Sequence, residues 1–151
     1  MGKEQKTLKG ISGLEYVEVQ NVPMNHYPDL GFAVHSKVMG EVEKLLAREF
    51  ILKHYQLRGQ EVKFLRALLG LSQRQLAEKL HMSHVAILKW EKAKSQPLDL
   101  VNEVALKALL SGFLGLKVPA SLEALTGIHE IPKKLVLDYT THSHAIKKKI
   151  A

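Results

Sequence analysis

Apolar residues recur at the three- and four-residue spacing of α-helices through residues 57–114, the most regular part of the chain. In LRGQEVKFLRALLG, Val62, Leu65 and Leu69 fall on one face of a helix that ends at Gly70. Glycine is favoured just past a helix C-terminus because it adopts a left-handed conformation without steric cost. The pattern therefore predicts a helix at the start of this segment.

Two shorter helical runs follow in LSQRQLAEKLHMSHVAILKWEKAKSQP, separated by a turn at His81. Ser72, with a glutamine three residues later, forms a capping-box pattern that starts the first run. Ser83 is a favoured N-cap for the second run, which continues to about Lys92. Histidine is among the residue types enriched at the positive φ that such a turn requires. A connection this short between two helices is typical of a helix-turn-helix.

The first third of the chain has a different pattern. Partial alternation in Leu14–Val22 predicts a strand that stops at Pro23, and HYPDLG has the composition of a turn. Phe32–Val34 is long enough for a short returning strand. Apolar residues then recur at helical spacing over Lys37–Tyr55, which predicts a long helix.

We therefore expect a mainly α fold in which a small N-terminal β element and a long helix precede a bundle that contains the helix-turn-helix. The predicted segments are 1–56, 57–114 and a partly ordered C-terminal extension, 115–151. Within the extension, SLEALTG suggests a helical turn, LVLDY either a strand or a docked extension, and HSHAIKKKIA a frayed terminus.

Composition narrows the possible functions. The chain has no cysteine, which excludes disulfides, thiol catalysis and cysteine-based zinc sites. Its net charge is +7, and residues 57–114 carry nine basic against five acidic residues, whereas residues 1–56 are neutral overall. A positive field that begins at the helix-turn-helix is expected if phosphates are the partner. No apolar run approaches the roughly 18 residues of a membrane span, and we expect a cytoplasmic protein.

The second helix of the motif has an unusual outer face. At 100° per residue its inner side carries Ile87 and Trp90, and its outer side mixes apolar with basic residues. A helix in a DNA major groove suits this mixture, because thymine presents a methyl group and guanine presents acceptors to lysine. The alternative, burial on both sides, is disfavoured by the cost of burying unpaired lysines. The candidate base-contacting residues are Ser83, His84, Val85, Leu88 and Lys89.

Phosphate contacts are expected at both ends of the motif. The free amides at a helix N-terminus attract anions, which places Gln73 and Arg74 beside a backbone phosphate. Lys92 and Lys94 follow the recognition helix and are expected to meet the other wall of the groove. These contacts position a protein on DNA without reading its sequence.

The segment LRGQEVKFLRALLGLSQRQLAEKLHMSHVAILKWEKAKSQP resembles the Cro/phage-repressor (XRE) class of helix-turn-helix, and this implies a lambda-repressor-like bundle. The matching residues are Leu71-Ser72-Gln73, Leu76-Ala77, Met82-Ser83, Ile87, Trp90-Glu91 and Lys94. The family implies that Gln73 grips phosphate and that Ser83, His84, Val85 and Lys89 read bases. The chain has Lys92-Ala93 where the family commonly has Asn-Gly.

The opening of that segment is similar to the MqsA-type antitoxins and related regulators, which join an N-terminal zinc ribbon to the helix-turn-helix. In NVPMNHYPDLGF the chain keeps the proline and glycine of a ribbon knuckle but has Tyr27 and Leu30 at the metal-ligand places. The resemblance thus implies a degenerate ribbon. The histidines do not form a compact set of four ligands in the sequence, so we expect neither a metal nor a cofactor.

The helix over Asp99–Phe113 is apolar nearly all round, with Asn102, Glu103 and Lys107 as the residues expected to face water. Such a helix has to bury two faces. We expect one face on the bundle core and the other on a second subunit, through Leu106, Leu110 and Phe113. The alternative is that residues 115–151 fold back over that face.

These observations favour a homodimeric transcriptional regulator that binds double-stranded DNA at a palindromic operator. The alternative is an antitoxin that neutralises a partner toxin and autoregulates its operon. An enzyme is disfavoured because the histidines and acidic residues lack catalytic spacing and no nucleophile or phosphate-loop motif is present. RNA binding is disfavoured by the 6% aromatic content.

Overall fold

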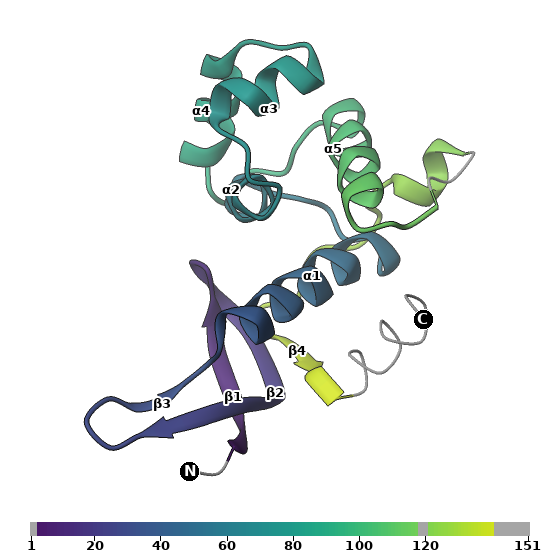
Figure 1. Cartoon of the computed structure of the whole chain (residues 1–151). Helices are drawn as coiled ribbons and strands as arrows, with labels where there is room; N and C mark the ends of the chain where they lie inside the picture. Colours follow the sequence, from purple (N-terminus) through teal and green to yellow (C-terminus); the bar gives the residue numbers. More distant parts are fainter. Residues whose placement is uncertain (1–2, 118–120, 141–151) are drawn as a thin grey trace. The chain divides into compact units, whose positions relative to one another are not determined.

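The computed structural model describes residues 3–117 and 121–140. Two compact units divide the chain (Figure 1): one contains the residues up to Leu46 together with those from Pro132 on, and the other runs from Ala47 to Ile131. The segments expected from the sequence do not coincide with these units, because a strand near the C-terminal end joins the N-terminal sheet.

The first unit contains a four-stranded sheet built on one long strand. β2 (Leu14–Tyr27) pairs antiparallel with β1 (Lys3–Ile11) and with the short β3 (Gly31–Ala33). β4 (Leu135–Asp138) pairs parallel with the first half of β2. The predicted strands at 14–22 and 32–34 are thus present, LVLDY contributes a strand, and β1 is an additional strand that the sequence pattern did not predict.

A bulge in β2 explains why its alternation is only partial. Val17 and Val19 are buried before the bulge, and Val22 and Met24 are buried after it. Asn21 lies between these pairs with a φ of 60°, and β2 has one more residue than β1 at this point. The Asn21 amide donates a hydrogen bond to the Asp138 carboxylate at 3.1 Å, which ties the bulge to β4.

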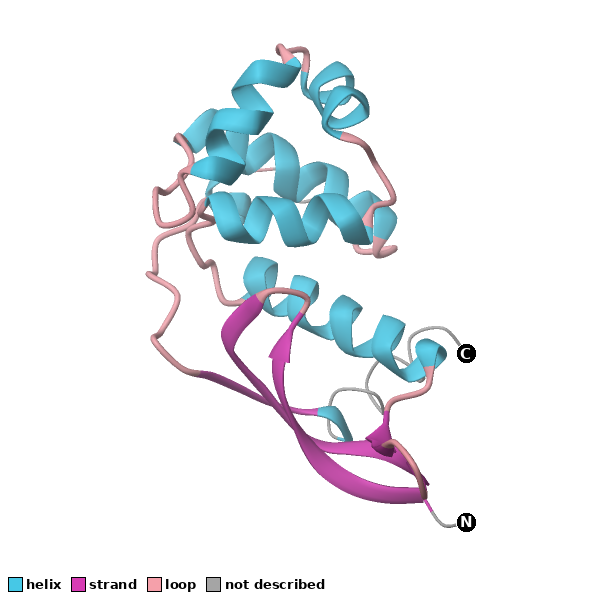
Figure 2. Ribbon diagram, turned by 90° about the vertical axis from the view of Figure 1, so that its left-hand side faces the viewer, coloured by secondary structure: helices cyan, strands magenta, loops and turns pink. Residues whose placement is uncertain are grey.

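Helix α1 (Ser36–Leu52) matches the long helix predicted over 37–55. Its first part lies along one face of the sheet (Figure 2), where Val42, Leu45 and Leu46 are buried. The Tyr139 hydroxyl, just after β4, donates to the Glu41 carboxylate on the same part of α1. The last residues of α1 belong to the second unit.

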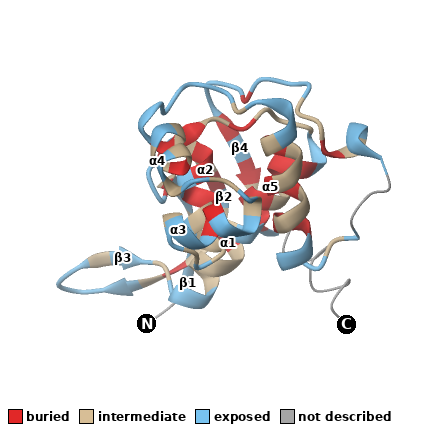
Figure 3. Ribbon diagram, turned by 90° about the horizontal axis from the view of Figure 1, so that it is seen from above, coloured by how far each residue is buried: buried red, intermediate tan, exposed pale blue. Residues whose placement is uncertain are grey.

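The second unit is helical. Its elements are α2 (Gly59–Leu68), α3 (Gln73–Leu80), α4 (His84–Lys92), α5 (Leu100–Phe113) and the 3₁₀ turn η1 (Leu122–Leu125). Its fully buried core joins all four helices, with Leu65 from α2, Leu76 from α3, Ile87 from α4 and Leu106 from α5. Figure 3 shows the buried positions of these helices in red.

The expectation of a mainly α fold is only partly correct. Over the residues that the structure describes, helices account for 48%, but strands account for 25%. The helical helix-turn-helix part is as expected, whereas the N-terminal β element is a full sheet rather than a small appendage.

α5 differs from its prediction in which residues face inward. Glu103 and Lys107, expected in water, are buried with 3% and 0% exposure. Leu106 and Leu110 are also fully buried, so they serve the core of their own unit, which corrects their assignment to a dimer interface. Phe113, the third residue of that set, is 46% exposed.

A buried ion pair on α5 holds the backbone that follows α1. The Lys107 ammonium lies 3.3 Å from the Glu103 carboxylate and donates to the Tyr55 carbonyl oxygen at 2.6 Å. Glu103 accepts a hydrogen bond from the Leu57 amide at 2.9 Å. Burial lowers the pKa of Lys107 below its ordinary value, and the charge of Glu103 opposes this shift.

Candidate nucleic-acid interface

The turn between α3 and α4 is defined by local hydrogen bonds. Ser72 caps α3: its hydroxyl accepts from the Gln75 amide at 3.1 Å, and the Gln75 side chain accepts from the Ser72 amide at 2.8 Å. His81 ends α3 in the left-handed region, with φ 56° and ψ 47°. Ser83 then caps α4 by accepting from the Ala86 amide at 3.3 Å. The predicted capping box, the positive φ of His81 and both helix starts are confirmed.

The inner face of α4 is fixed by small and apolar residues. Ile87 is fully buried, and Ala77 on α3 is 2% exposed. Met82 donates its amide to the Ala77 carbonyl oxygen at 2.9 Å, which closes the turn against α3. A small residue at position 77 allows the two helices to approach closely over so short a connection.

A partly buried ion pair joins α4 to α2. The Arg66 guanidinium donates to both oxygens of Glu91, at 2.7 and 2.9 Å. Arg66 also donates to the Leu71 carbonyl oxygen at 3.1 Å, so it fastens the loop before α3 as well. The hydrogen bond to Glu91 raises the pKa of Arg66, so the guanidinium stays charged. The sequence pattern gave no sign of this pair, although Glu91 follows Ile87 by four residues on the buried face.

The predicted phosphate contacts gather where α3 begins and α4 ends. The Gln73 side chain donates to Glu91 at 3.3 Å, which brings the N-terminus of α3 beside the C-terminal turn of α4. Arg74 and Lys92, the neighbours of these two residues in sequence, are both exposed. Gln73 itself is half-buried, and its side chain has a defined orientation because of this hydrogen bond.

The predicted base-contacting residues lie outside the core. Ser83 and Lys89 are exposed, and Val85 is 45% exposed although it is apolar. His84 and Leu88 are half-buried on the flanks of the same face. The outer face of α4 thus combines apolar and basic side chains next to one another.

The chain leaves α4 without a left-handed residue. Ala93, in the place where the XRE family commonly has glycine, ends the helix with φ −86° and ψ 64°. The backbone beyond it is held by α2, because the Gln60 amide donates to the Lys94 carbonyl oxygen and the Gly59 amide to that of Gln96, each at 3.2 Å. These bonds satisfy two of the free amides at the start of α2 and fix the position of Lys94.

Other kinds of site find little support in the described part of the chain. Residues 3–117 and 121–140 contain no group of three or more histidine, aspartate or glutamate side chains placed to hold a metal ion. His26 packs against the Phe32 ring, with centroids 4.9 Å apart. His142 and His144 lie outside the described residues. Among the helices of those ranges, none has the length and apolar character needed to cross a membrane.

Comparison with protein families identifies the segment described above. Residues 62–100, from α2 to the start of α5, match a family model described as helix-turn-helix, of the XRE type. No curated protein and no solved structure matches the chain. The predicted helix-turn-helix is therefore confirmed, and with it a DNA-binding domain of the kind found in transcription regulators. The match does not extend to residues 1–61, and the resemblance to MqsA-type antitoxins with a degenerate zinc ribbon finds no support.

Proposed function

We propose that the chain is a sequence-specific transcription regulator that binds double-stranded DNA as a homodimer, with α4 in the major groove and without catalytic activity. The outer face of α4 carries this proposal. Val85 is an exposed apolar residue on the first turn, and Lys89 is exposed one turn later. In water the exposed Val85 side chain contributes no stabilising contact. In the major groove a thymine methyl would pack against Val85, and a guanine would accept a hydrogen bond from Lys89.

The basic residues of the motif gather where α3 begins and α4 ends, rather than on opposite walls of the groove as the sequence suggested. The Gln73–Glu91 hydrogen bond brings the start of α3, with Arg74, beside the last turn of α4, with Lys92, and Lys94 follows α4. If about four to six phosphates are contacted per dimer, the logarithm of the binding constant falls with the logarithm of the salt concentration with a slope of about −4 to −5. The net positive charge of residues 57–114 adds a long-range attraction.

We propose a homodimer because a single short recognition helix contacts too few base pairs to specify an operator. α4 has nine residues, and only its first two turns project base-reading side chains. Two copies related by a two-fold axis would place two such helices about 34 Å apart, one turn of DNA, on a palindromic operator. Sequencing DNA fragments selected by the purified protein tests this directly, because palindromy and half-site spacing report the dimer.

Removing Lys89 and removing Lys92 are expected to have different effects. Lys89→Ala deletes a base contact and is expected to cost about 1–3 kcal/mol of binding free energy and to flatten the preference at one base pair. Lys92→Ala deletes a phosphate contact, so it weakens all sequences alike and makes the salt slope shallower by about 1 per subunit. Fluorescence anisotropy titrations on the selected site and its single-base variants measure both.

Lys63→Ala is the matched control, because it removes an exposed lysine from α2, outside the two helices of the motif. We expect this variant to keep both the sequence preference and most of the salt slope. Indistinguishable effects of Lys89→Ala and Lys92→Ala across all sites would contradict the assignment of base reading to Lys89.

The antitoxin function is the second candidate, and the tip of the β2–β3 hairpin favours it. Tyr27, Leu30 and Phe32 are 41%, 83% and 38% exposed there, an apolar cluster suited to a protein partner. Co-expression with the neighbouring reading frame tests it. A toxic neighbour whose growth arrest is relieved by the chain, but not by a Leu30→Ser/Phe32→Ser variant, supports an antitoxin; a harmless neighbour removes this candidate.

A further inference from the structure

The exposed face of α5 carries no charged side chain. The two charged residues of this helix, Glu103 and Lys107, form the buried ion pair, so the usual arrangement of an amphipathic helix is reversed. Leu100 is 55% exposed, Val101 75% and Phe113 46%. A helix surface of this kind is typical of one that another apolar surface covers.

Four residues form a straight stripe along this face, and we call it the α5 stripe: Val101, Ala105, Ala108 and Gly112. At 100° per residue they fall within about 60° of one another. The stripe has a projecting residue at one end and a hollow at the other. Val101 projects into solvent, whereas a Cβ atom added to Gly112 would meet nothing within 4 Å. The two alanines lie between them and are half-buried.

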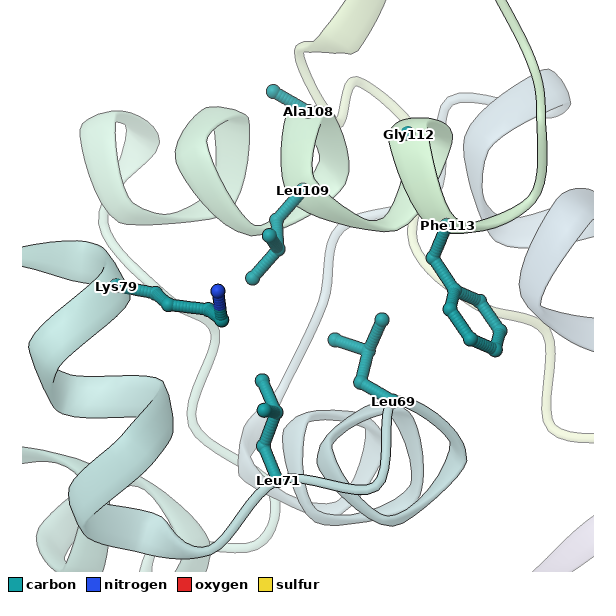
Figure 4. Close-up of a pocket in the computed structure, with 7 residues that line it drawn as sticks. All are labelled: Leu69, Leu71, Lys79, Ala108, Leu109, Gly112 and Phe113. Atoms are coloured by element: carbon teal, nitrogen blue, oxygen red, sulfur yellow. The ribbon is translucent and has the colours of Figure 1, made fainter.

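The hollow continues into a groove of about 410 Å³ beside Gly112 (Figure 4). Leu69 and Leu71, from the end of α2 and the loop after it, face Leu109 across the groove, and Phe113 bounds it at the end of α5. Lys79 of α3 extends its aliphatic stem along the remaining side. The walls are therefore mainly apolar and come from α3, from α5 and from the segment that joins α2 to α3, all in one unit.

We propose that the occupant of this surface is the α5 of a second copy of the chain, packed antiparallel across a two-fold axis midway between Ala105 and Ala108. This inference rests on the proposed function, because it assumes the homodimer proposed there. In this register Ala105 of each copy lies opposite Ala108 of the other, and Val101 of each copy lies opposite Gly112 of the other. The projecting valine then enters the hollow and the groove beside it.

The register makes the surface self-complementary, which is the requirement for a closed two-fold interface. Val104 of each copy lies opposite Leu109 of the other, and Leu100 opposite Phe113. Large side chains therefore meet one another only along the edges of the interface. Alanines at the crossing point allow the two helix axes to approach closely. Because α5 presents no charged side chain on this face, and Lys79 alone among the residues that line the groove is charged, a second copy fits this surface better than a nucleic acid or a charged protein. Phe113 thus keeps its expected place in the interface, while outward residues replace Leu106 and Leu110.

A carboxylate on the α5 stripe tests the interface. Val101→Glu lies in the first turn of α5, where the helix dipole favours a negative charge, so the single copy folds normally. In the dimer it would move one carboxylate from water into each groove, whose walls are apolar except for Lys79, and we expect the dimer dissociation constant to rise at least about 100-fold. Ile128→Glu is the matched control, because Ile128 is 64% exposed but lies outside the stripe. Sedimentation equilibrium measures both variants.

Cross-linking tests the antiparallel register. The chain has no cysteine, so Val101→Cys and Gly112→Cys each introduce a single thiol. On oxidation, a mixture of the two variants is expected to give a disulfide-linked dimer, because a disulfide needs Cβ atoms about 4 Å apart. Each variant alone is expected to remain uncross-linked, since its two thiols would lie about 16 Å apart along the helices.

The results separate this inference from the proposed function. Loss of the dimer in Val101→Glu, with single half-sites still bound as by the unaltered chain, and cross-linking only in the mixture support the interface. A monomeric unaltered chain, a dimer that survives Val101→Glu, or equal cross-linking of Val101→Cys alone overturns it, even if DNA is bound. An intact dimer with the expected cross-link that selects no duplex overturns the function and leaves the interface standing.

Discussion

Gly59→Ala is expected to destabilise the second unit by about 3 kcal/mol and to abolish specific DNA binding. A Cβ atom at position 59 would overlap the Trp90 carbonyl oxygen and lie 2.8 Å from that of Ala93. Both obstacles are backbone atoms of the end of α4, so neither can move without shifting the recognition helix. Overpacking of this kind typically costs 1–3 kcal/mol, and a clash with backbone belongs at the upper end.

Urea denaturation followed by the fluorescence of Trp90, the single tryptophan of the chain, measures the effect in the unit concerned. Gly40→Ala in α1 is the control, because a Cβ atom there meets nothing within 4 Å. Gly40 lies in the first unit, so this control is expected to leave the unfolding free energy reported by Trp90 within about 0.5 kcal/mol of that of the unaltered chain. An unfolding free energy unchanged by Gly59→Ala would contradict the close contact of α2 with α4.

Lys107→Met is expected to cost about 3–5 kcal/mol of unfolding free energy, because it leaves the buried charge of Glu103 without its partner. The sharper expectation concerns the double variant. Glu103→Gln keeps an oxygen that can accept from the Leu57 amide but removes the charge. Glu103→Gln/Lys107→Met is therefore expected to be more stable than Lys107→Met alone, although it carries one more substitution. A double variant less stable than that single one would contradict a penalty from the unpaired charge.

The pH dependence offers a second readout for the same pair. Because burial lowers the folded-state pKa of Lys107, the unfolded chain binds more protons between that pKa and the ordinary value of 10.5. Stability from this group accordingly rises as pH increases through that window. The rise is expected to be absent in Lys107→Met.

The helices of the second unit were predictable because their signals are local. Apolar spacing and two serine caps define α3 and α4, and the predicted start and end of α3 agree with the observed Gln73–Leu80. The left-handed conformation of His81 was also predictable from the sequence, because histidine is one of the few residue types enriched at positive φ.

The missed features depend on distant parts of the chain. β1 has the sequence KEQKTLKGI, which contains too many charged residues to show the alternation of a strand. Its strand conformation is instead stabilised by antiparallel pairing with β2. Glu103 and Lys107 face inward because the backbone at Tyr55 and Leu57 offers partners that no local pattern shows. The Arg66–Glu91 pair likewise joins residues 25 positions apart.

The central claim is that the outer face of α4 reads base edges in the major groove, and a combined substitution of protein and DNA tests it most directly. Replacing the guanine read by Lys89 with 7-deazaguanine removes one major-groove acceptor and leaves the minor groove unchanged. For the unaltered chain we predict a loss of affinity of about five-fold or more, and for Lys89→Ala no further loss from the same replacement. Equal losses in both proteins at every guanine of the operator, or no loss in either, would contradict the account.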